Sequence, residues 1–327
     1  MQVIIPLAGK GTRLRPHTHL VPKPMLKVAG RPVMDWVMDR LDGLGVDELI
    51  FITGHLKEQV EAYATSRYGL PARYVEQRVQ DGTAGAVNLA RPFVKGPSMI
   101  IFVDTVFEAD LSLVTSKDAD GIIWAKEVED YQRFGVVVTD ADGFMTKIVE
   151  KPSTPISKLA NIGLYYMRDM DALYAGIDAT LAAPANKGEY YLTDAFQHMI
   201  EHGKRIYTAE VGGWYDCGKL DTLLETNEVL LAKGAAARPT FGADVTVVEP
   251  VLIAADVTIT NSTIGPNVTI EAGSVIADST LRHSILGTRC TIAGSTLHGS
   301  MLGNRVSTTG VHGTFSLGDD CELVGAR

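Results

Sequence analysis

The sequence predicts an α/β fold with a mostly parallel sheet, followed by a C-terminal β-helix. Three observations predict it: apolar runs alternate with helix-like segments in the first part, the composition changes after residue 235, and short β-branched pieces follow. At 327 residues the chain exceeds one average domain, so a large and a smaller domain are expected. We predict these domains at residues 1–235 and 241–327.

The first part contains short apolar runs that are separated by segments of helical period. The expected strands are residues 3–9, 48–54, 72–77 and 98–104. The expected helices are residues 33–45, 57–69 and 84–94. Strands that are separated by helices are typical of a parallel sheet covered on both faces. Ligands of such sheets bind beyond the carboxyl ends of the strands.

The last part has a different repeat, which follows an expected linker at residues 233–240. Its apolar positions recur in steps of five or six, at Ile253, Ile259, Ile264, Ile270, Ile276, Leu281, Leu286, Ile292, Leu297 and Leu302. A step near six suits a β-helix, in which each short face sends one apolar residue inward. An antiparallel sandwich is the alternative, but its turns would be spaced more widely.

Composition narrows the class of partner and the compartment. The chain carries 30 Lys and Arg against 39 Asp and Glu, a net charge of −9, with no long basic run. This argues against nucleic acid or an anionic membrane as the main partner. The N-terminal apolar run is too short for a signal peptide, and no apolar stretch has the length of a membrane span. Three cysteines without metal-ligand spacing favour the cytoplasm.

The strongest chemical signal is the segment LAGKGTRLRP at residues 7–16, with PKPM at residues 22–25. Glycines directly after a strand let backbone N–H groups approach an anion closely. Arg13 and Lys23 can then offset the charge of a transferring phosphoryl group. The segment is neither a Walker A loop nor the dinucleotide fingerprint. The candidate nucleotide-binding residues here are Leu7, Ala8, Gly9, Gly11 and Thr12.

Two further positions suggest a metal and a nucleobase. Asp104 ends a buried apolar strand, where a carboxylate is either a turn-former or a ligand for a hard cation. Gln77 can donate and accept together, which suits the imide edge of uracil or thymine, and Gly82 leaves room for the base. The alternative for this second segment is a polar loop with a helix start.

Taken together, G-x-G-T-R-x-x-P and P-K-P-M resemble the signature loop of the sugar-1-phosphate nucleotidyltransferases. The resemblance recurs in order over nearly the whole chain and is strongest to the long-form glucose-1-phosphate thymidylyltransferases. It implies a Rossmann-like nucleotidyltransferase domain followed by a left-handed β-helix. It also implies that a nucleoside triphosphate and a hexose 1-phosphate, such as dTTP or UTP with glucose 1-phosphate, form a nucleoside-diphosphate sugar and pyrophosphate. The family further suggests a homo-oligomer.

The resemblance assigns roles to residues along the chain. Asp104 and Asp216, the latter in GWYDCG at residues 213–218, match the aspartates that hold the catalytic Mg²⁺. Val103 and Cys217 depart from the glycine and threonine common beside them. Gln77 and Gly82 match residues that contact a pyrimidine base.

The sugar end of the substrate site is implied in the same way. Glu150 matches a residue that accepts hydrogen bonds from sugar hydroxyls, and Lys151 one that binds the sugar phosphate. The amide of Gly135 and the side chain of Asn161 would complete the pocket. The segment 188–194 also matches the family, but we interpret it mainly as a helix start capped by Thr193 or Asp194.

Several alternatives remain open from the sequence. The string G-T-A-G at residues 82–85 also resembles mannose-1-phosphate guanylyltransferases, and a specificity like that of N-acetylglucosamine-1-phosphate uridylyltransferases is possible. A non-catalytic regulatory subunit would have lost the cations or acids that this chain retains.

The histidines suggest no covalent nucleophile or general base. His283, His298 and His312 raise acyl transfer by the β-helix, but we expect a role in assembly and regulation. Deleting residues 241–327 should therefore disturb the oligomer or its stability more than the chemistry. The loop histidines His17, His19 and His55 are expected on the surface or at caps.

Overall fold

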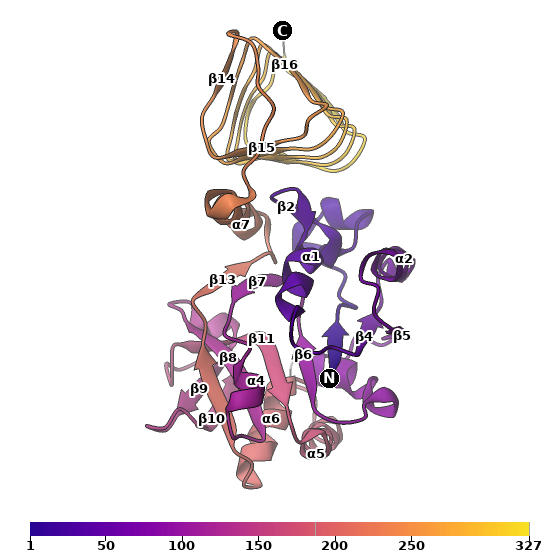
Figure 1. Ribbon diagram of the computed structural model, residues 1–327, viewed down its shortest axis with the longest axis vertical. Helices are drawn as coiled ribbons and strands as arrows, with labels where there is room; N and C mark the ends of the chain where they lie inside the picture. The colour runs from indigo at the N-terminus through magenta and orange to yellow at the C-terminus, as the bar shows by residue number, and fades with distance from the viewer. Residues whose placement is uncertain (187, 327) are drawn as a thin grey trace. The chain divides into compact units, whose positions relative to one another are not determined.

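The computed structural model describes residues 1–186 and 188–326 (Figure 1). It contains two compact units, Met1–Lys10 with Val37–Trp214, and Gly11–Trp36 with Tyr215–Arg327. Arg327, which ends the predicted β-helix domain, lies outside the described residues. The units follow packing and not chain order, so the boundaries 1–235 and 241–327 stay a prediction about domains that fold independently.

The first unit is built on a large sheet whose N-terminal half is parallel. Neighbouring strands are β6 (Ser98–Ile101), β1 (Gln2–Pro6), β4 (Glu48–Thr53) and β5 (Ala72–Glu76), in that order. Every residue of β1 and β6 is buried, which explains why both read as continuous apolar runs. The intervening helices are α2 (Lys57–Arg67) and α3 (Thr83–Asn88). The predicted mostly parallel α/β sheet is confirmed.

The other half of this sheet adds antiparallel pairs. The strand β11 (Leu159–Met167) runs antiparallel to β6 and to β8 (Gly121–Glu127). A hairpin of β9 (Gly135–Thr139) and β10 (Met145–Glu150) pairs with β11, and β12 (Ile206–Glu210) runs parallel to β8. Further elements of the unit are η5 (Arg91–Phe93), β7 (Thr105–Glu108), α4 (Leu113–Ser116) and η6 (Tyr131–Arg133).

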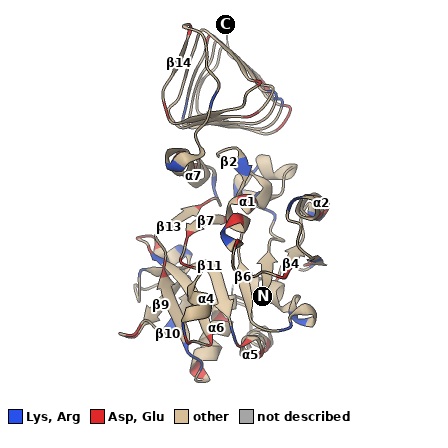
Figure 2. Cartoon of the chain, viewed as in Figure 1, with Lys and Arg blue, Asp and Glu red and all other residues tan. Residues whose placement is uncertain are grey.

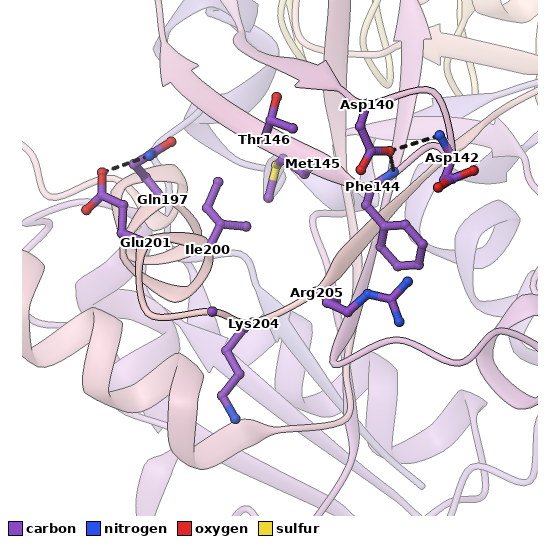
Figure 3. A pocket seen from close by; sticks show the side chains of 11 residues that line it. Asp140, Asp142, Phe144, Met145, Thr146, Gln197, Ile200, Glu201, Lys204 and Arg205 are labelled. Atoms are coloured by element: carbon purple, nitrogen blue, oxygen red, sulfur yellow. Dashed lines mark hydrogen bonds between the residues drawn. The ribbon is translucent and has the colours of Figure 1, made fainter.

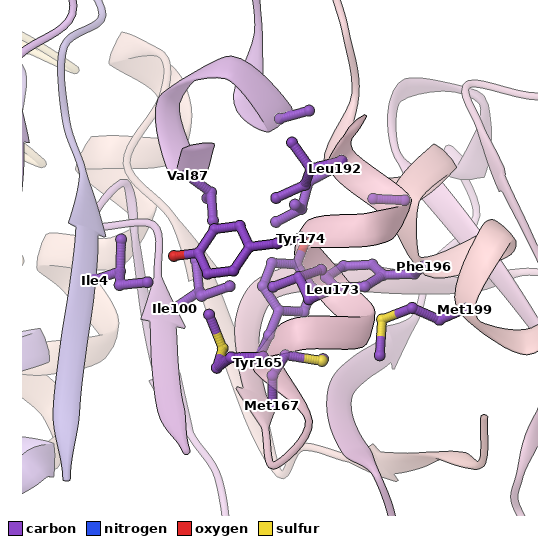
Figure 4. Close-up of a cluster of buried hydrophobic side chains, with 14 of the residues drawn as sticks. Ile4, Val87, Ile100, Tyr165, Met167, Leu173, Tyr174, Leu192, Phe196 and Met199 are labelled. Atoms are coloured by element: carbon purple, nitrogen blue, oxygen red, sulfur yellow. The ribbon is translucent and has the colours of Figure 1, made fainter. Parts of the chain in front are cut away.

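Two helices pack on the sheet and form its main core with α3. They are α5 (Met170–Ala182) and α6 (Leu192–Glu201), and α5 begins where the Asp169 carboxylate accepts the N–H of Ala172. Leu173 and Phe196 from these helices belong to one buried cluster with Tyr165, Ile4 and Ile100 of the strands (Figure 4). Burial of each such side chain contributes about 1.5–3 kcal/mol, so this layer holds the sheet and its loops in place.

The second unit ends in a left-handed β-helix whose short strands form three parallel sheets, seen as triangular coils in Figure 1. One sheet contains β14 (Val245–Val247), β17 (Ser262–Ile264), β20 (Thr280–Arg282), β23 (Thr296–His298) and β26 (His312–Gly313). The next, here called the β15 face, contains β15 (Val251–Ile253), β18 (Val268–Ile270), β21 (Ile285–Leu286), β24 (Met301–Leu302) and β27 (Ser316–Leu317). The last contains β16 (Thr258–Thr260), β19 (Val275–Ala277), β22 (Thr291–Ala293), β25 (Ser307–Thr309) and β28 (Glu322–Val324).

The apolar positions predicted from the repeat all face the interior of these coils. Ile253, Ile270, Leu286 and Leu302 are consecutive partners in the β15 face, and the same stacking occurs in the other two sheets. All ten predicted positions are buried. The β-helix prediction is confirmed, and the antiparallel sandwich is wrong.

The corners of the coils carry residues with positive φ. One corner has Asn261, Asp278, Gly294 and Gly310, the second has Asn267, His283 and Gly299, and the third has Gly273, Arg289, Arg305 and Asp320. Left-handed backbone favours glycine and asparagine, because other side chains approach the following carbonyl. The corners therefore account for many of the small polar residues between the apolar positions.

The second unit also contains several short elements and one helix from outside the β-helix. They are η1 (Thr12–Leu14), η2 (His17–His19), η3 (Lys23–Met25), β2 (Lys27–Val28), β3 (Arg31–Pro32) and α7 (Leu220–Leu230). The boundaries between the units fall within α1 (Val33–Met38), which η4 (Asp39–Leu41) follows, and within β13 (Gly213–Asp216). The expected helix at 33–45 is thus shorter than predicted. None of the helices among the described residues is long and apolar enough to cross a membrane.

The expected linker at 233–240 is partly structured. Leu231–Ala235 continues α7 as a π-helical turn. Ala237 then forms a parallel bridge with Leu252, donating to Val251 and accepting from Ile253. The chain therefore starts to pair with the β15 face before the first full coil.

Candidate active site

The first four residues of the signature loop, Leu7–Lys10, follow β1 in the first unit. The N–H of Leu7 donates to Ile52 O at 2.9 Å, and Gln80 Nε2 donates to Ala8 O at 2.8 Å. A Cβ on Gly54 would lie 2.6 Å from that same carbonyl, so the ends of β1 and β4 are in close backbone contact. A Cβ on Gly9 would meet nothing within 4 Å, and Gly9 is exposed. Its backbone is accessible in the way that phosphate contact requires.

Gln77 lies at the carboxyl end of β5, beside this loop. Its N–H donates to Thr53 O at 2.8 Å, and its side-chain Nε2 donates to Asp81 Oδ1 at 3.0 Å and to Gly82 O at 3.1 Å. The carboxylate of Asp81 requires a donor, which fixes the amide with its Oε1 as the remaining acceptor. Gln77 is buried, so its orientation is well defined.

The structure requires a glycine at position 82, apart from the predicted need for space beside a base. Its φ is +118°, and a Cβ there would lie 2.4 Å from Tyr190 O. The backbone of Tyr190 also donates to Asp81 O at 2.7 Å and accepts from Ala84 at 3.0 Å. The loop at 81–84 is therefore fastened to the segment that leads into α6.

The predicted sugar residues of the first unit converge on one point. A Cβ on Gly135 would lie 2.4 Å from Asn161 Nδ2, 2.7 Å from Thr193 Cγ2 and 2.8 Å from Glu150 Oε2. Asn161 Nδ2 donates to Gly135 O at 2.8 Å, while the hydroxyl of Tyr165 donates to Asn161 Oδ1. The missing side chain at Gly135 is what lets these groups approach one another.

Glu150 and Lys151 are held by neighbours from α6 and its start. Thr193 Oγ1 donates to Glu150 Oε2 at 3.1 Å. Lys151 has φ +45°, its Nζ donates to Tyr191 Oη at 3.2 Å, and it lies 3.6 Å from Glu150 Oε1. These contacts keep one carboxylate and one ammonium side by side, as hydroxyl and phosphate binding requires.

The electrostatics of this pair follow from burial and from each other. Burial raises the pKa of the Glu150 carboxyl, and the Lys151 ammonium and the Thr193 hydroxyl partly offset that rise. Burial lowers the pKa of Lys151, but the hydrogen bond to Tyr191 and the charge of Glu150 outweigh it, so the pKa lies above its ordinary value. Lys151 is therefore a fixed cation at neutral pH.

The cationic half of the signature loop belongs to the second unit. Arg13 lies in η1 with an exposed side chain, and Thr12 precedes it. Gly11 has φ +60°, and a Cβ there would lie 3.1 Å from Lys23 Cβ. The turn from Gly11 to Lys23 is thus closely packed on itself.

Asp216 lies near Lys23 in this unit. Its Oδ1 accepts the N–H of Gly218 at 2.7 Å and its Oδ2 accepts the hydroxyl of Thr222 at 3.2 Å. A Cβ on Gly218 would lie 2.8 Å from Asp216 Oδ1 and 3.6 Å from Lys23 Nζ, so the acid and the cation border the same point.

Asp104 lies between β6 and β7 in the first unit, so the predicted strand 98–104 ends at Ile101. The N–H of Gly212 donates to Glu108 O at 2.9 Å, which joins the segments that lead out of Asp104 and into β13. Among residues 1–186 and 188–326 no group of three or more His, Cys, Asp or Glu is placed to hold a metal. Two carboxylates remain a donor set that fits Mg²⁺, which commonly takes one or two protein carboxylates together with waters and substrate phosphates.

Two interpretations from the sequence are wrong. The helix α6 begins at Leu192 after Tyr191, with no side-chain cap hydrogen bond, and Thr193 bonds to Glu150 instead. His17 is buried and not on the surface, with its Nε2 lying 3.1 Å from Ser316 Oγ.

Three contributing residues were missed: Gln80, Tyr165 and Tyr191. Each supports a predicted residue, namely Ala8, Asn161 and Lys151. Tyr165 and Tyr191 lay in segments that match the family, at residues 160–166 and 188–194, but neither was given a role, and nothing in the local pattern points to Gln80.

A separate hollow of about 330 Å³ lies on the first unit, lined by the β9–β10 turn, α6 and the start of β12 (Figure 3). It contains none of the predicted site residues. Its cations are engaged, because Lys204 Nζ lies 2.6 Å from Asp169 Oδ2 and the Arg205 guanidinium lies 4.0 Å from the Phe144 ring centroid. Lys and Arg are otherwise interspersed with Asp and Glu along the chain (Figure 2).

Known proteins match the chain over most of its length. A family model described as nucleotidyl transferase matches residues 2–233. UTP–glucose-1-phosphate uridylyltransferase AglF of Haloferax volcanii is 34% identical over 221 residues, which cover 65% of this chain and 89% of that protein. Glucose-1-phosphate thymidylyltransferase of Streptomyces griseus is 27% identical over 341 residues, covering 94% of both chains.

Two further matches cover the chain in part. The bifunctional protein GlmU of Methanococcus aeolicus is 34% identical and covers 71% of this chain, which spans only 54% of that protein. The crystal structure of UDP-glucose pyrophosphorylase complexed with UDP-glucose superposes with a TM-score of 0.62 at 24% identity, covering 71% of this chain and 98% of that chain. The structural likeness concerns the fold. With the family match over residues 2–233, the chain belongs to the sugar-1-phosphate nucleotidyltransferases.

Proposed function

We propose that the enzyme couples UTP or dTTP to glucose 1-phosphate in the cytoplasm and releases pyrophosphate. We infer the preferred base from the orientation of the Gln77 side-chain amide. Its Nε2 is engaged by Asp81 and Gly82, so Oε1 is the group left to contact a base. An acceptor pairs with the ring N–H of uracil, thymine or guanine, and repels the ring acceptors of cytosine and adenine.

The reaction needs alignment and charge neutralisation more than a nucleophilic side chain. The sugar phosphate oxygen that attacks the α-phosphorus is already anionic. In this proposal the backbone of Leu7, Ala8, Gly9, Gly11 and Thr12 cradles the triphosphate. Arg13 and Lys23 offset the charge that develops on the transferring group and the pyrophosphate.

The metal role is assigned to Asp104 and Asp216. These two carboxylates would hold Mg²⁺, which would supply positive charge to offset that of the phosphates. For Asp216, the hydrogen bonds from the Gly218 N–H and the Thr222 hydroxyl fix the orientation of the carboxylate.

The acceptor sugar phosphate is assigned to the cluster around Gly135. Glu150 accepts from sugar hydroxyls, Lys151 binds the phosphate, and the Gly135 amide and Asn161 side chain complete the pocket. The convergence of these groups within hydrogen-bond distance supports the assignment.

One panel tests this proposal. Pyrophosphate release is measured for dTTP, UTP, GTP, CTP and ATP, each with glucose, mannose and N-acetylglucosamine 1-phosphates. We expect UTP or dTTP with glucose 1-phosphate to give the highest kcat/KM, and CTP and ATP the lowest. Preference for GTP with mannose 1-phosphate would establish the guanylyltransferase alternative, and preference for N-acetylglucosamine 1-phosphate the other sugar specificity. Preference for CTP or ATP would refute the role of Gln77.

The β-helix is proposed to serve assembly and regulation in a homo-oligomer. A molar mass in solution that is a multiple of 35.2 kDa would support this, and a monomer would contradict it. Release of CoA from acetyl-CoA with glucosamine 1-phosphate tests the acyltransfer alternative.

A further inference from the structure

The catalytic loop segment Gly11–Lys23 and the β-helix are packed together within the second unit. Their contacts involve the β15 face, one of the three sides of the coil. The segment reaches this face at its middle, through Pro16 and His17, and again just after its end, at Lys27–Gly30.

The middle contact is made by the last coil. His17 Nε2 lies 3.1 Å from Ser316 Oγ of β27, and the side chain is only 6% exposed. Beside it, a Cβ on Gly318 would lie 3.3 Å from Pro16 Cβ. His17 follows Arg13 by four residues, so the coil holds the loop close in sequence to the proposed catalytic cation.

Hydrogen bonds within the loop connect His17 to the turn that carries Arg13. The hydroxyl of Thr18, next to His17, donates to Gly11 O at 2.8 Å. The N–H of Leu14 donates to the same carbonyl at 3.0 Å. A shift of His17 therefore moves the turn from which Arg13 projects.

The second contact joins the loop end and α7 to the first coils. Lys27 Nζ lies 2.6 Å from Glu271 Oε2, immediately after β18. Asn227 of α7 is fully buried, and its Oδ1 accepts both Ala29 N–H at 2.8 Å and Thr269 Oγ1 of β18 at 2.7 Å.

The helix α7 also reaches the proposed metal ligand. Thr226, the residue before Asn227, donates its hydroxyl to Asp216 O at 3.0 Å. One buried asparagine thus connects the chain after Lys23, the helix after Asp216 and the β15 face.

We propose that the β15 face is a positioning element for nucleotidyl transfer, which holds the Arg13–Lys23 loop through His17–Ser316 and Asp216 through Asn227. The inference rests on the proposed roles of Arg13 and Asp216. His17, Ser316 and Asn227 are positioning residues, because they act on the reaction through the groups they hold.

The test uses Ser316→Ala in the full-length enzyme, because Ser316 is exposed and its hydroxyl is not part of the coil interior. Loss of one hydrogen bond behind a group that acts on the transition state should lower kcat about fivefold. We expect KM for both substrates to stay the same, and the Tm to fall by no more than about a few degrees. Ser316→Thr, which keeps the hydroxyl, should restore kcat. The matched control is Ser307→Ala, in β25 on another face of the coil.

An activity-independent measurement accompanies the kinetics. Hydrogen exchange of the amides in residues 11–19 should accelerate about fivefold in Ser316→Ala and not in Ser307→Ala. Unchanged exchange and unchanged kcat in Ser316→Ala would overturn the positioning role, as would an equal loss in the control. Faster exchange without a change in kcat also overturns it, because the contact would then be structural only. If the wild-type enzyme fails the substrate panel, the proposed function falls, and exchange alone decides whether the coil holds the loop.

Discussion

At the residue scale, the absence of a side chain at Gly135 allows the proposed sugar pocket to form. Any side chain there would overlap Asn161, Thr193 and Glu150, three groups from different elements. The sequence pointed to Gly135, Glu150 and Asn161 through the family motif. It did not predict the contact of Thr193 with Glu150 or that of Tyr165 with Asn161, because these contacts join different elements, which no local pattern encodes.

At this scale, Lys151→Ala should raise KM for the sugar 1-phosphate about 10- to 100-fold, because it removes a charge-assisted contact to phosphate. Steady-state kinetics with each substrate varied in turn measure the effect. The control is Lys158→Ala, an exposed lysine paired with Glu129 at 2.7 Å, which should be neutral. An unchanged KM in Lys151→Ala would remove this assignment.

Asp104→Asn and Asp216→Asn should each lower kcat by about 100-fold or more in excess Mg²⁺, because the metal loses an anionic ligand. An asparagine at 216 can still accept the N–H of Gly218, so the Tm of that variant should stay close to wild type. Asp221→Asn, at the exposed start of α7, is the control. Near-normal turnover in either ligand variant would contradict the metal assignment.

At the scale of elements, the sequence was most informative where burial makes a simple pattern. β1, β4 and β6 are enclosed by the sheet and its helices, and their apolar runs identified them. Their ends were less predictable, since β6 stops at Ile101 where Phe102 N–H bonds to Gly163 O, across the irregular part of β11. The antiparallel half of the sheet was not predicted in detail, because strands such as β9 and β10 mix buried with partly or fully exposed positions.

The β-helix offers a matched test of its interior. Leu281 is fully buried in β20, whereas Val275 in β19 is 45% exposed. Leu281→Ala should lower the free energy of unfolding by about 2–5 kcal/mol, because it leaves a cavity in the stack. Val275→Ala should change it by less than about 1 kcal/mol. Chemical denaturation measures both, and equal effects would argue against an ordered apolar stack.

For the whole molecule, the grouping of Gly11–Trp36 with the β-helix is the feature that sequence reasoning missed. Its contacts join residues about 200 to 300 positions apart, such as His17 with Ser316 and Lys27 with Glu271. From the sequence, deleting residues 241–327 was expected to affect assembly more than chemistry. With these contacts, we expect the deletion to affect the chemistry as well. Deleting them would expose His17 and Asn227 and remove the partners of the catalytic loop.

The burial of His17 also predicts how stability depends on pH. Burial lowers its pKa from 6.5 to about 4, and the charge of Asp319 offsets part of that effect. The unfolded chain therefore takes up a proton first as the pH falls. The contribution of the neutral His17 side chain to the free energy of unfolding is fully present above about pH 6.5. It is lost as the pH falls toward 4, by about 3 kcal/mol at most.

His17→Gln keeps a hydrogen-bond donor for Ser316 but cannot titrate. Its free energy of unfolding should fall less steeply between pH 7 and pH 4 than that of the wild-type enzyme. His19→Gln, at the exposed neighbouring position, should follow the wild-type curve. Parallel curves for wild type and His17→Gln would contradict the burial of a neutral imidazole.

The corners of the coil with left-handed backbone are places where a substitution could raise the stability of the fold. Arg289 occupies such a corner at φ +57°. The equivalent corner position of the preceding coil is a glycine, Gly273. A backbone of this hand costs a non-glycine residue about 1 kcal/mol. Replacing Arg289 by asparagine would relieve part of that cost. Arg305 in the same corner is different, because its guanidinium is paired with Asp320 through two hydrogen bonds, at 2.6 and 2.8 Å, that a shorter side chain would lose. The corner at Arg289 is therefore the place where one substitution could make the enzyme more resistant to heat.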